Sequence, residues 1–121
     1  MADYIQQVSI TARKAVQARD WATVRACAKE IIGRQRDNAE GYFLQGLVEK
    51  AANRPDQALK LFSRALGFDS KRYDAAVEMA GQYLRLHQYG DAAELLEQYQ
   101  ALLENSPMYL DMAGTIYTNI G

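Results

Sequence analysis

Few side chains in this sequence could carry out chemistry on a substrate. The chain contains one histidine, His87, and one cysteine, Cys27. His87 has no cysteine, serine or carboxylate spaced to act with it as a nucleophile or an acid–base partner. One histidine and one cysteine also cannot complete a zinc site. We therefore expect no enzyme activity, no metal and no cofactor. His87 is predicted to lie in a solvated turn and Cys27 in the core, with a reactive thiol as the alternative for Cys27.

Two further patterns have both a catalytic and a structural interpretation. Glu94, Glu97 and Glu104 share one face of a predicted helix, where they could form an acid–base pair or a solvated surface. We favour the solvated surface, because charges along a helix usually face water. The segment GFDSKR, residues 67–72, has neither the glycine spacing nor the lysine placement of a phosphate-binding loop.

Length and composition indicate one globular domain. The chain has 121 residues, of which 49% are hydrophobic and 24% charged. It contains no apolar run near 18 residues, and its first residues, MADYIQQVSITARK, lack the apolar core of a secretory signal. We expect a cytoplasmic protein that does not cross a membrane.

The charge changes sign along the chain. Residues 1–38 hold seven basic and four acidic groups, residues 39–72 six and four, and residues 73–121 one and seven. The basic first part raises the possibility of nucleic-acid binding, but its groups are spread around two predicted helices and its net charge of +3 is small. We therefore expect no nucleic-acid partner. The basic residues concerned are Arg13, Lys14, Arg19, Arg25, Lys29, Arg34 and Arg36.

The elements that must position any site are predicted to be helices. Ala, Leu, Gln, Glu, Lys and Arg dominate and only two prolines, Pro55 and Pro107, occur. Asn38 and Ser106 stand where helix N-caps are expected, and both prolines stand at first helical positions. The pattern predicts an all-α fold of about seven helices, near 4–18, 21–34, 39–52, 55–67, 73–86, 89–104 and 107–119.

The sequence repeats every 34 residues. Residues 39–72 align with residues 73–106 without a gap, and each position keeps its size class: Gly46 with Ala80, Ala58 with Ala92, and Phe62 with Leu96. A divergent copy precedes them at 5–38, and half a copy follows at 107–121. The predicted organisation is three and a half helix-turn-helix units. Within each pair, small residues such as Gly46 and Ala58 would let the two helices approach closely.

These features resemble the tetratricopeptide repeat (TPR), whose period is also 34. The residues that fit its pattern are Tyr42, Gly46, Ala58, Phe62 and Ala65 in the second unit, Ala80, Tyr83, Tyr89, Ala92 and Leu96 in the third, and Leu110, Gly114 and Tyr117 in the partial one. Glu49, Ser70, Tyr99 and Glu104 depart from it, since Tyr99 stands where Ala65 suggests a small group. The resemblance implies a right-handed α-solenoid and a non-catalytic protein-interaction module.

By the same resemblance, the first helix of each unit lines a concave groove that binds a peptide or a partner helix. The groove positions are Ser9, Arg13, Phe43, Leu47, Lys50, Val77, Gly81, Leu84, Arg85 and Asp111, continued by Thr115. The ligand would carry hydrophobic anchors and an acidic group for the basic side chains of this set. The alternative is that Phe43 and Leu47 belong to the core. Some TPR proteins hold a chaperone's C-terminal carboxylates with lysine, asparagine and arginine, and Ser9, Arg13 and Phe43 at the matching places make that activity unexpected here.

Residues 107–121 end half-way through a unit. The predicted helix 107–119 could cap the third unit or join a second copy of the chain, and we expect self-association. The stretches KRYDAAVEMA and SPMYLDMAGTIYTNIG also resemble N-terminal repeats of bacterial proteins in which a sulfotransferase domain follows a TPR region. The alternative function is therefore a scaffold region of a larger enzyme, with catalysis outside this chain.

Substituting Ala58 by leucine tests the predicted close approach of the helices. The larger side chain should overpack the contact and lower the free energy of unfolding by about 1–3 kcal/mol. Thermal or urea unfolding measures this change. An unchanged melting temperature would show that Ala58 does not face the paired helix.

Overall fold

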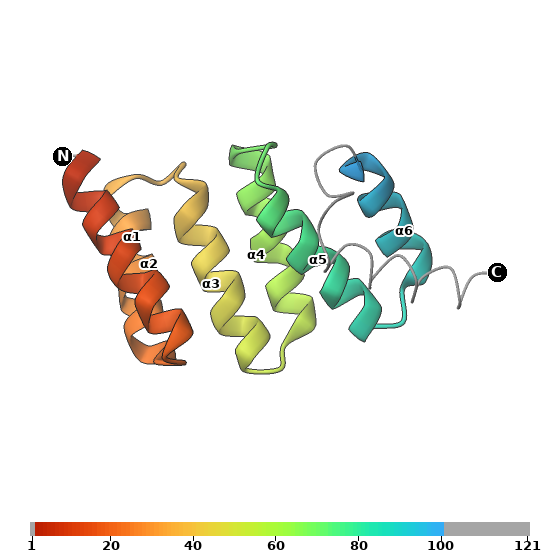
Figure 1. Ribbon diagram of the computed structural model, residues 1–121, viewed down its shortest axis with the longest axis horizontal. Coiled ribbons are helices and arrows are strands. Elements are labelled where there is room, and N and C mark those ends of the chain that lie inside the picture. The colour runs from red at the N-terminus through yellow and green to blue at the C-terminus, as the bar shows by residue number, and fades with distance from the viewer. Residues whose placement is uncertain (1, 101–121) are drawn as a thin grey trace.

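The computed structural model describes residues 2–100 of the chain. This part folds into helices joined by short turns and contains no strand (Figure 1). The elements are α1 (Ala2–Gln17), α2 (Trp21–Arg34), α3 (Ala39–Ala51), α4 (Pro55–Phe68), α5 (Tyr73–Arg85) and α6 (Tyr89–Gln98). No helix among the described residues has the length and hydropathy needed to cross a membrane.

The sequence predicts the ends of α1 to α5 to within two residues. The sixth helix is shorter than the predicted 89–104, because it ends at Gln98. The N–H of Tyr99 is shared between the carbonyls of Leu95 (3.3 Å) and Leu96 (3.2 Å), a tightening that is common at a helix end. The predicted seventh helix, 107–119, lies outside the described residues.

The helices stand side by side in one row, with α1 at one end and α6 at the other (Figure 1). Each helix packs against its neighbour in the chain, from α1 on α2 through to α5 on α6. Connections of only a few residues force consecutive helices to run antiparallel, so that alternate helices lie on the same side of the row.

The turns inside the helical pairs repeat with the period of the sequence. Helices α2, α4 and α6 begin at residues 21, 55 and 89, which are 34 apart. Each preceding turn has one residue with positive φ: Arg19 (57°), Asn53 (61°) and His87 (58°). The next N–H then bonds a carbonyl five residues back: Asp20 to Ala15 (2.8 Å), Arg54 to Glu49 (2.9 Å) and Gln88 to Tyr83 (2.8 Å). This is the Schellman arrangement, which satisfies the last carbonyls of a helix.

Local signals fix where several helices begin. The side chain of Asn38 caps α3, because it accepts a hydrogen bond from the N–H of Glu40 at 2.9 Å. Pro55 occupies the first turn of α4, where its missing N–H has no intrahelical partner to lose. Asp20 caps α2 by accepting from the N–H of Thr23 at 3.3 Å. The first two of these agree with the sequence prediction.

Small residues lie where the helices of a pair approach. Ala58 and Ala65 are fully buried in α4, and Phe62 is the largest fully buried side chain between them. A Cβ atom added to Gly46 would lie 2.5 Å from the ring of Phe62. The absence of a side chain at Gly46 therefore provides the space that the ring fills.

The departure at Tyr99 has a structural explanation. Ala65, one period earlier, is fully buried, whereas Tyr99 is a buried aromatic side chain. Its hydroxyl donates a hydrogen bond to the carbonyl of Ser70 at 3.1 Å. The larger residue thus satisfies a polar backbone group in the loop before α5.

The preceding pair serves the equivalent carbonyl from the other helix. There the Tyr42 hydroxyl, on α3, donates to the carbonyl of Arg36 at 2.7 Å. The residue one period after Tyr42 is Ala76, which packs in the same core cluster as Tyr99. A tyrosine on one helix and an alanine on the other have exchanged places between the two pairs, which keeps both the packing and the hydrogen bond.

A double substitution tests the size matching at Gly46. Gly46→Ala should lower the free energy of unfolding by about 1–2 kcal/mol, because the overpacking exceeds the gain in helix propensity. Adding Phe62→Leu reproduces the alanine and leucine found at residues 80 and 96, so the double variant should lose clearly less than the sum of the single losses. Urea unfolding of the four proteins measures the coupling. Strictly additive losses would show that the two residues do not share this space.

Candidate functional site

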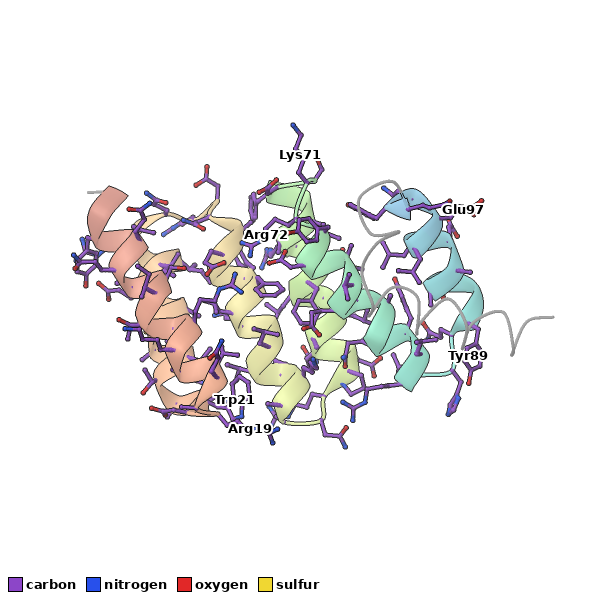
Figure 2. The ribbon with its side chains drawn as sticks, viewed as in Figure 1. Arg19, Trp21, Lys71, Arg72, Tyr89 and Glu97 are labelled. Carbon is purple, nitrogen blue, oxygen red and sulfur yellow. The ribbon has the colours of Figure 1, made fainter. Side chains whose placement is uncertain are left out.

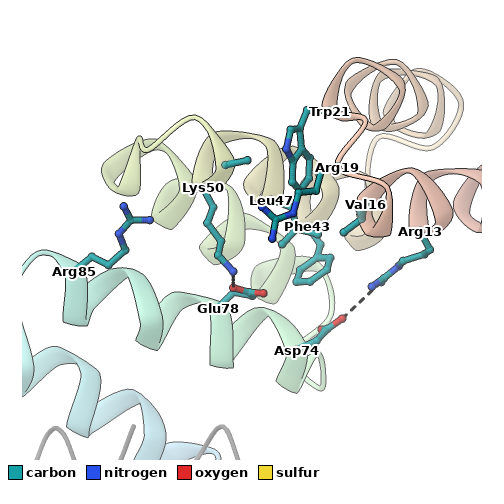
Figure 3. Close-up of a pocket in the computed structure, with 11 residues that line it drawn as sticks. Arg13, Val16, Arg19, Trp21, Phe43, Leu47, Lys50, Asp74, Glu78 and Arg85 are labelled. Atoms are coloured by element: carbon teal, nitrogen blue, oxygen red, sulfur yellow. Dashed lines mark hydrogen bonds and ion pairs between the residues drawn. The ribbon is translucent and has the colours of Figure 1, made fainter. Parts of the chain in front are cut away.

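A pocket of about 630 Å³ opens between α1, α3 and α5 (Figure 3). Its size lies within the range of ligand-binding clefts. We call it the central pocket, and its lining residues are Arg13, Val16, Arg19, Trp21, Phe43, Leu47, Lys50, Ala51, Asp74, Glu78 and Arg85. All come from α1, α3, α5 or the turn from α1 to α2, with Trp21 at the first position of α2.

The central pocket gathers half of the predicted groove positions. Arg13, Phe43, Leu47, Lys50 and Arg85 line it together. Four other positions are described but are not among its lining residues: Ser9, which bonds Glu40 beside it, and Val77, Gly81 and Leu84. Asp111 and Thr115 lie outside the described residues.

Glu40 is the centre of a charged network at the start of α3. Its carboxylate accepts two hydrogen bonds from Arg13, at 2.9 and 2.7 Å, one from the Ser9 hydroxyl at 2.5 Å and one from Arg72 at 2.8 Å. Arg72 also bonds Asp74 at 3.2 and 2.8 Å. The Arg13–Glu40 pair is bidentate, which is a strong geometry for an ion pair. The network joins α1, α3 and the start of α5.

The same two arginines enclose an aromatic ring. The guanidinium of Arg13 lies 5.0 Å from the centre of the Phe43 ring, and that of Arg72 lies 4.8 Å from it. Phe43 also packs on Phe62, with ring centres 5.6 Å apart. Cation–π contact and ion pairing therefore hold Arg13 in place from two directions.

The other predicted basic residues also have partners within the chain. Lys50 forms an ion pair with Glu78 at 2.7 Å, which links α3 to α5. Arg85 donates a hydrogen bond to the side-chain carbonyl of Asn53, a neutral group. No ion pair of Arg19 is found among the described residues. The basic side chains of the central pocket thus differ in how fully their charge is compensated.

The family follows from the repeat pattern of sequence and structure. The family model for the tetratricopeptide repeat matches residues 49–114, which is more than half of the chain. The chain belongs to the tetratricopeptide-repeat family. No curated protein matches the sequence.

Solved TPR structures share the fold at low sequence identity. The TPR domain of Arabidopsis OM64 has a TM-score of 0.85 at 16% identity, covering 96% of each chain. The TPR2B domain of yeast Sti1, solved in complex with pHsp70, has 0.79 at 17%, covering 95% of this chain and 94% of that one. The Yersinia enterocolitica type III secretion chaperone SycD, in complex with a peptide of the translocator YopD, has 0.77 at 16%, covering 98% and 91%. The predicted α-solenoid of TPR units is confirmed.

The apolar side chains of the predicted TPR groove differ in how far ligands can reach them. Phe43, Leu47 and Val77 are 3%, 7% and 6% exposed, so they contribute mainly to the core. Val16 and Trp21 are half-buried and keep apolar surface open to the central pocket. The core interpretation therefore describes Phe43 and Leu47 well, and Trp21 offers the larger accessible anchor surface.

Sequence reasoning missed several lining residues because it considered only inward positions of the first helices. Trp21 begins α2 and Arg19 lies in the turn, yet both reach the central pocket (Figures 2 and 3). Asp74 and Glu78 were also missed, although their charge opposite to the basic positions was a usable signal. Trp21 could have been noticed as the single tryptophan of the chain, beside a predicted turn.

The residues with reactive side chains lie away from the central pocket. His87 is exposed, and its Nδ1 lies 2.9 Å from the Tyr89 hydroxyl. Burial raises the pKa of the half-buried Cys27 thiol, and the nearby charges of Asp20 and Glu30 raise it further. A raised pKa makes the thiol a poorer nucleophile. Among the described residues, no group of three or more potential metal ligands gathers.

The environment of Glu40 lowers its pKa. Burial alone would raise it, but hydrogen bonds from Arg13 and Ser9, the charge of Arg13 and a hydrogen bond from Arg72 outweigh the burial and lower the pKa from 4.5 to about 2. A carboxylate with a lowered pKa stabilises the fold fully above its unfolded pKa near 4.5, and this contribution is lost as the pH falls towards 2.

Glu40→Gln should make the fold less stable in a pH-dependent way. We expect the loss in unfolding free energy to be larger at pH 7 than at pH 2.5 by about 2–3 kcal/mol, because protonation removes the same charge from the native protein. Urea unfolding at both values measures this difference. Glu97→Gln, at an exposed position of α6, is the control and should change stability little at either pH. Equal losses at both pH values would contradict the assigned network.

Proposed function

We propose that this TPR chain is a non-catalytic protein-interaction module whose central pocket receives a peptide or a helix of a partner protein. The proposal rests on one observation: a pocket of about 630 Å³ in which the accessible surface of Trp21 is surrounded by charged side chains. Such a combination of an aromatic anchor surface with polar groups around it is typical of protein interaction sites.

The solved TPR structures support this choice of ligand. One holds pHsp70 and another holds a peptide of the translocator YopD. The helices that form the central pocket begin at equivalent phases of the 34-residue period for α3 and α5. We assign α1–α2, α3–α4 and α5–α6 to the units 5–38, 39–72 and 73–106, with 107–121 as the start of a further unit.

Other expectations about the chain stay predictions. None of the comparisons supports a link to a sulfotransferase, so the enzyme-scaffold alternative has only its sequence resemblance. Self-association through residues 107–121 concerns a segment outside the described residues. The cytoplasmic location and the absence of a nucleic-acid partner rest on the sequence alone.

The single tryptophan allows a direct test. Peptides of twelve residues, selected from a random display library on the full chain and synthesised without tryptophan, should change the emission of Trp21 in a saturable titration. The control chain carries Trp21→Phe and Tyr89→Trp, which moves the reporter to α6, an element that does not line the central pocket. Its emission should stay constant while a labelled peptide still binds. Binding that leaves the emission of Trp21 unchanged would place the interaction site elsewhere.

A further inference from the structure

The charges around the central pocket divide into two groups along α3 and α5. Where these helices begin, the guanidiniums of Arg13 and Arg72 face the carboxylates of Glu40 and Asp74. Arg72 and Glu40 are each only 14% exposed. Two positive and two negative groups compensate each other here, so this end of the pocket offers little net attraction to a charged ligand.

The other group lies where α1, α3 and α5 end. It contains Arg19, Lys50 and Arg85 with a single carboxylate, Glu78, which Lys50 binds at 2.7 Å. Arg85 bonds the neutral Asn53, and Arg19 has no ion pair among the described residues. Two exposed guanidiniums at this end therefore have no acidic partner in the part of the chain that the structure describes.

The accessible apolar surface of the central pocket lies at the same end. Trp21 stands next to Arg19 and above Leu47, while Lys50 and Arg85 follow towards α5 (Figure 3). Ala51, at the end of α3, leaves room between them. An apolar side chain on Trp21 would thus place the adjoining residues of a ligand beside cationic groups.

We propose that the ligand of the central pocket is an acidic segment of a partner protein, with a bulky apolar side chain on Trp21 and carboxylates on Arg19 and Arg85. This inference rests on the proposed function and specifies its partner. Arg13 and Lys50, which the sequence predicts as acid-binding residues, would have to give up Glu40 and Glu78 before they could bind a ligand. Arg19 and Arg85 can form charge-assisted hydrogen bonds without breaking an existing ion pair.

Charge complementarity decides in favour of this occupant. A neutral segment would leave both guanidiniums without a partner, and a basic segment would be repelled by them. Because the two arginines are exposed, desolvating them costs little, and the attraction should depend on salt. The expected gain is therefore mainly in specificity and association rate.

The test uses the full chain and the selected twelve-residue peptides. These should be enriched in Asp or Glu next to a bulky apolar residue, and replacing the acids by Asn or Gln should weaken binding. Arg19→Gln and Arg85→Gln should each raise the dissociation constant about three- to tenfold and flatten its salt dependence. Arg19→Lys should retain most of the affinity. The matched controls are Arg25→Gln and Lys71→Gln, at exposed positions outside the central pocket, and should leave binding unchanged.

The outcomes separate this inference from the proposed function. Peptides that alter Trp21 emission but show no acidic enrichment, and bind the Arg19 and Arg85 variants normally, would overturn the inference and leave the module intact. Peptides that bind without affecting Trp21 would overturn both. Retention on heparin that both substitutions abolish, with no acidic peptide selected, would assign the two arginines to a polyanion such as nucleic acid and also overturn it.

Discussion

Close approach of the helices is the constraint on which this structure depends. Two helix backbones can lie near each other only where side chains are small, and every larger group must then fit the space beside that contact. Gly46 and Phe62 show both sides of this rule, because the ring occupies the volume that any side chain at Gly46 would need. The following pair has an alanine and a leucine at these positions, a different division of a similar volume. The repeat therefore conserves combined size more strictly than residue identity.

This constraint explains why the helices were predictable from the sequence and why one departure was not. Apolar spacing, turns and caps are local, and they repeat every 34 residues, so the ends of α1 to α5 follow from them. Tyr99 was unexpected because its role depends on two distant positions, the alanine at residue 76 and the carbonyl of Ser70. Local patterns also did not indicate where α6 ends, because the shared hydrogen bonds of the Tyr99 N–H appear only in three dimensions.

The candidate site was predictable in part for a similar reason. The 34-residue phase identifies which faces of α1, α3 and α5 turn inward, and half of the positions named from it line the central pocket. It does not show which charges are already paired. Arg13 meets a carboxylate 27 residues away, and Lys50 meets one 28 residues away. Nor does it identify Trp21, since residues near a turn reach the pocket only because α1 and α2 are packed at a particular angle.

The division between paired and unpaired charges has a consequence for how the module could evolve a specificity. Arg13 and Phe43 are tied to Glu40 and Arg72, so changing any of them would disturb the contacts among α1, α3 and α5. Arg19 lies in an exposed turn, and Arg85 ends α5 with a single hydrogen bond to Asn53. Substitutions at these two positions would alter the charge presented to a ligand without removing an ion pair from the fold. Recognition is thus left to the side chains that the packing of the helices does not need.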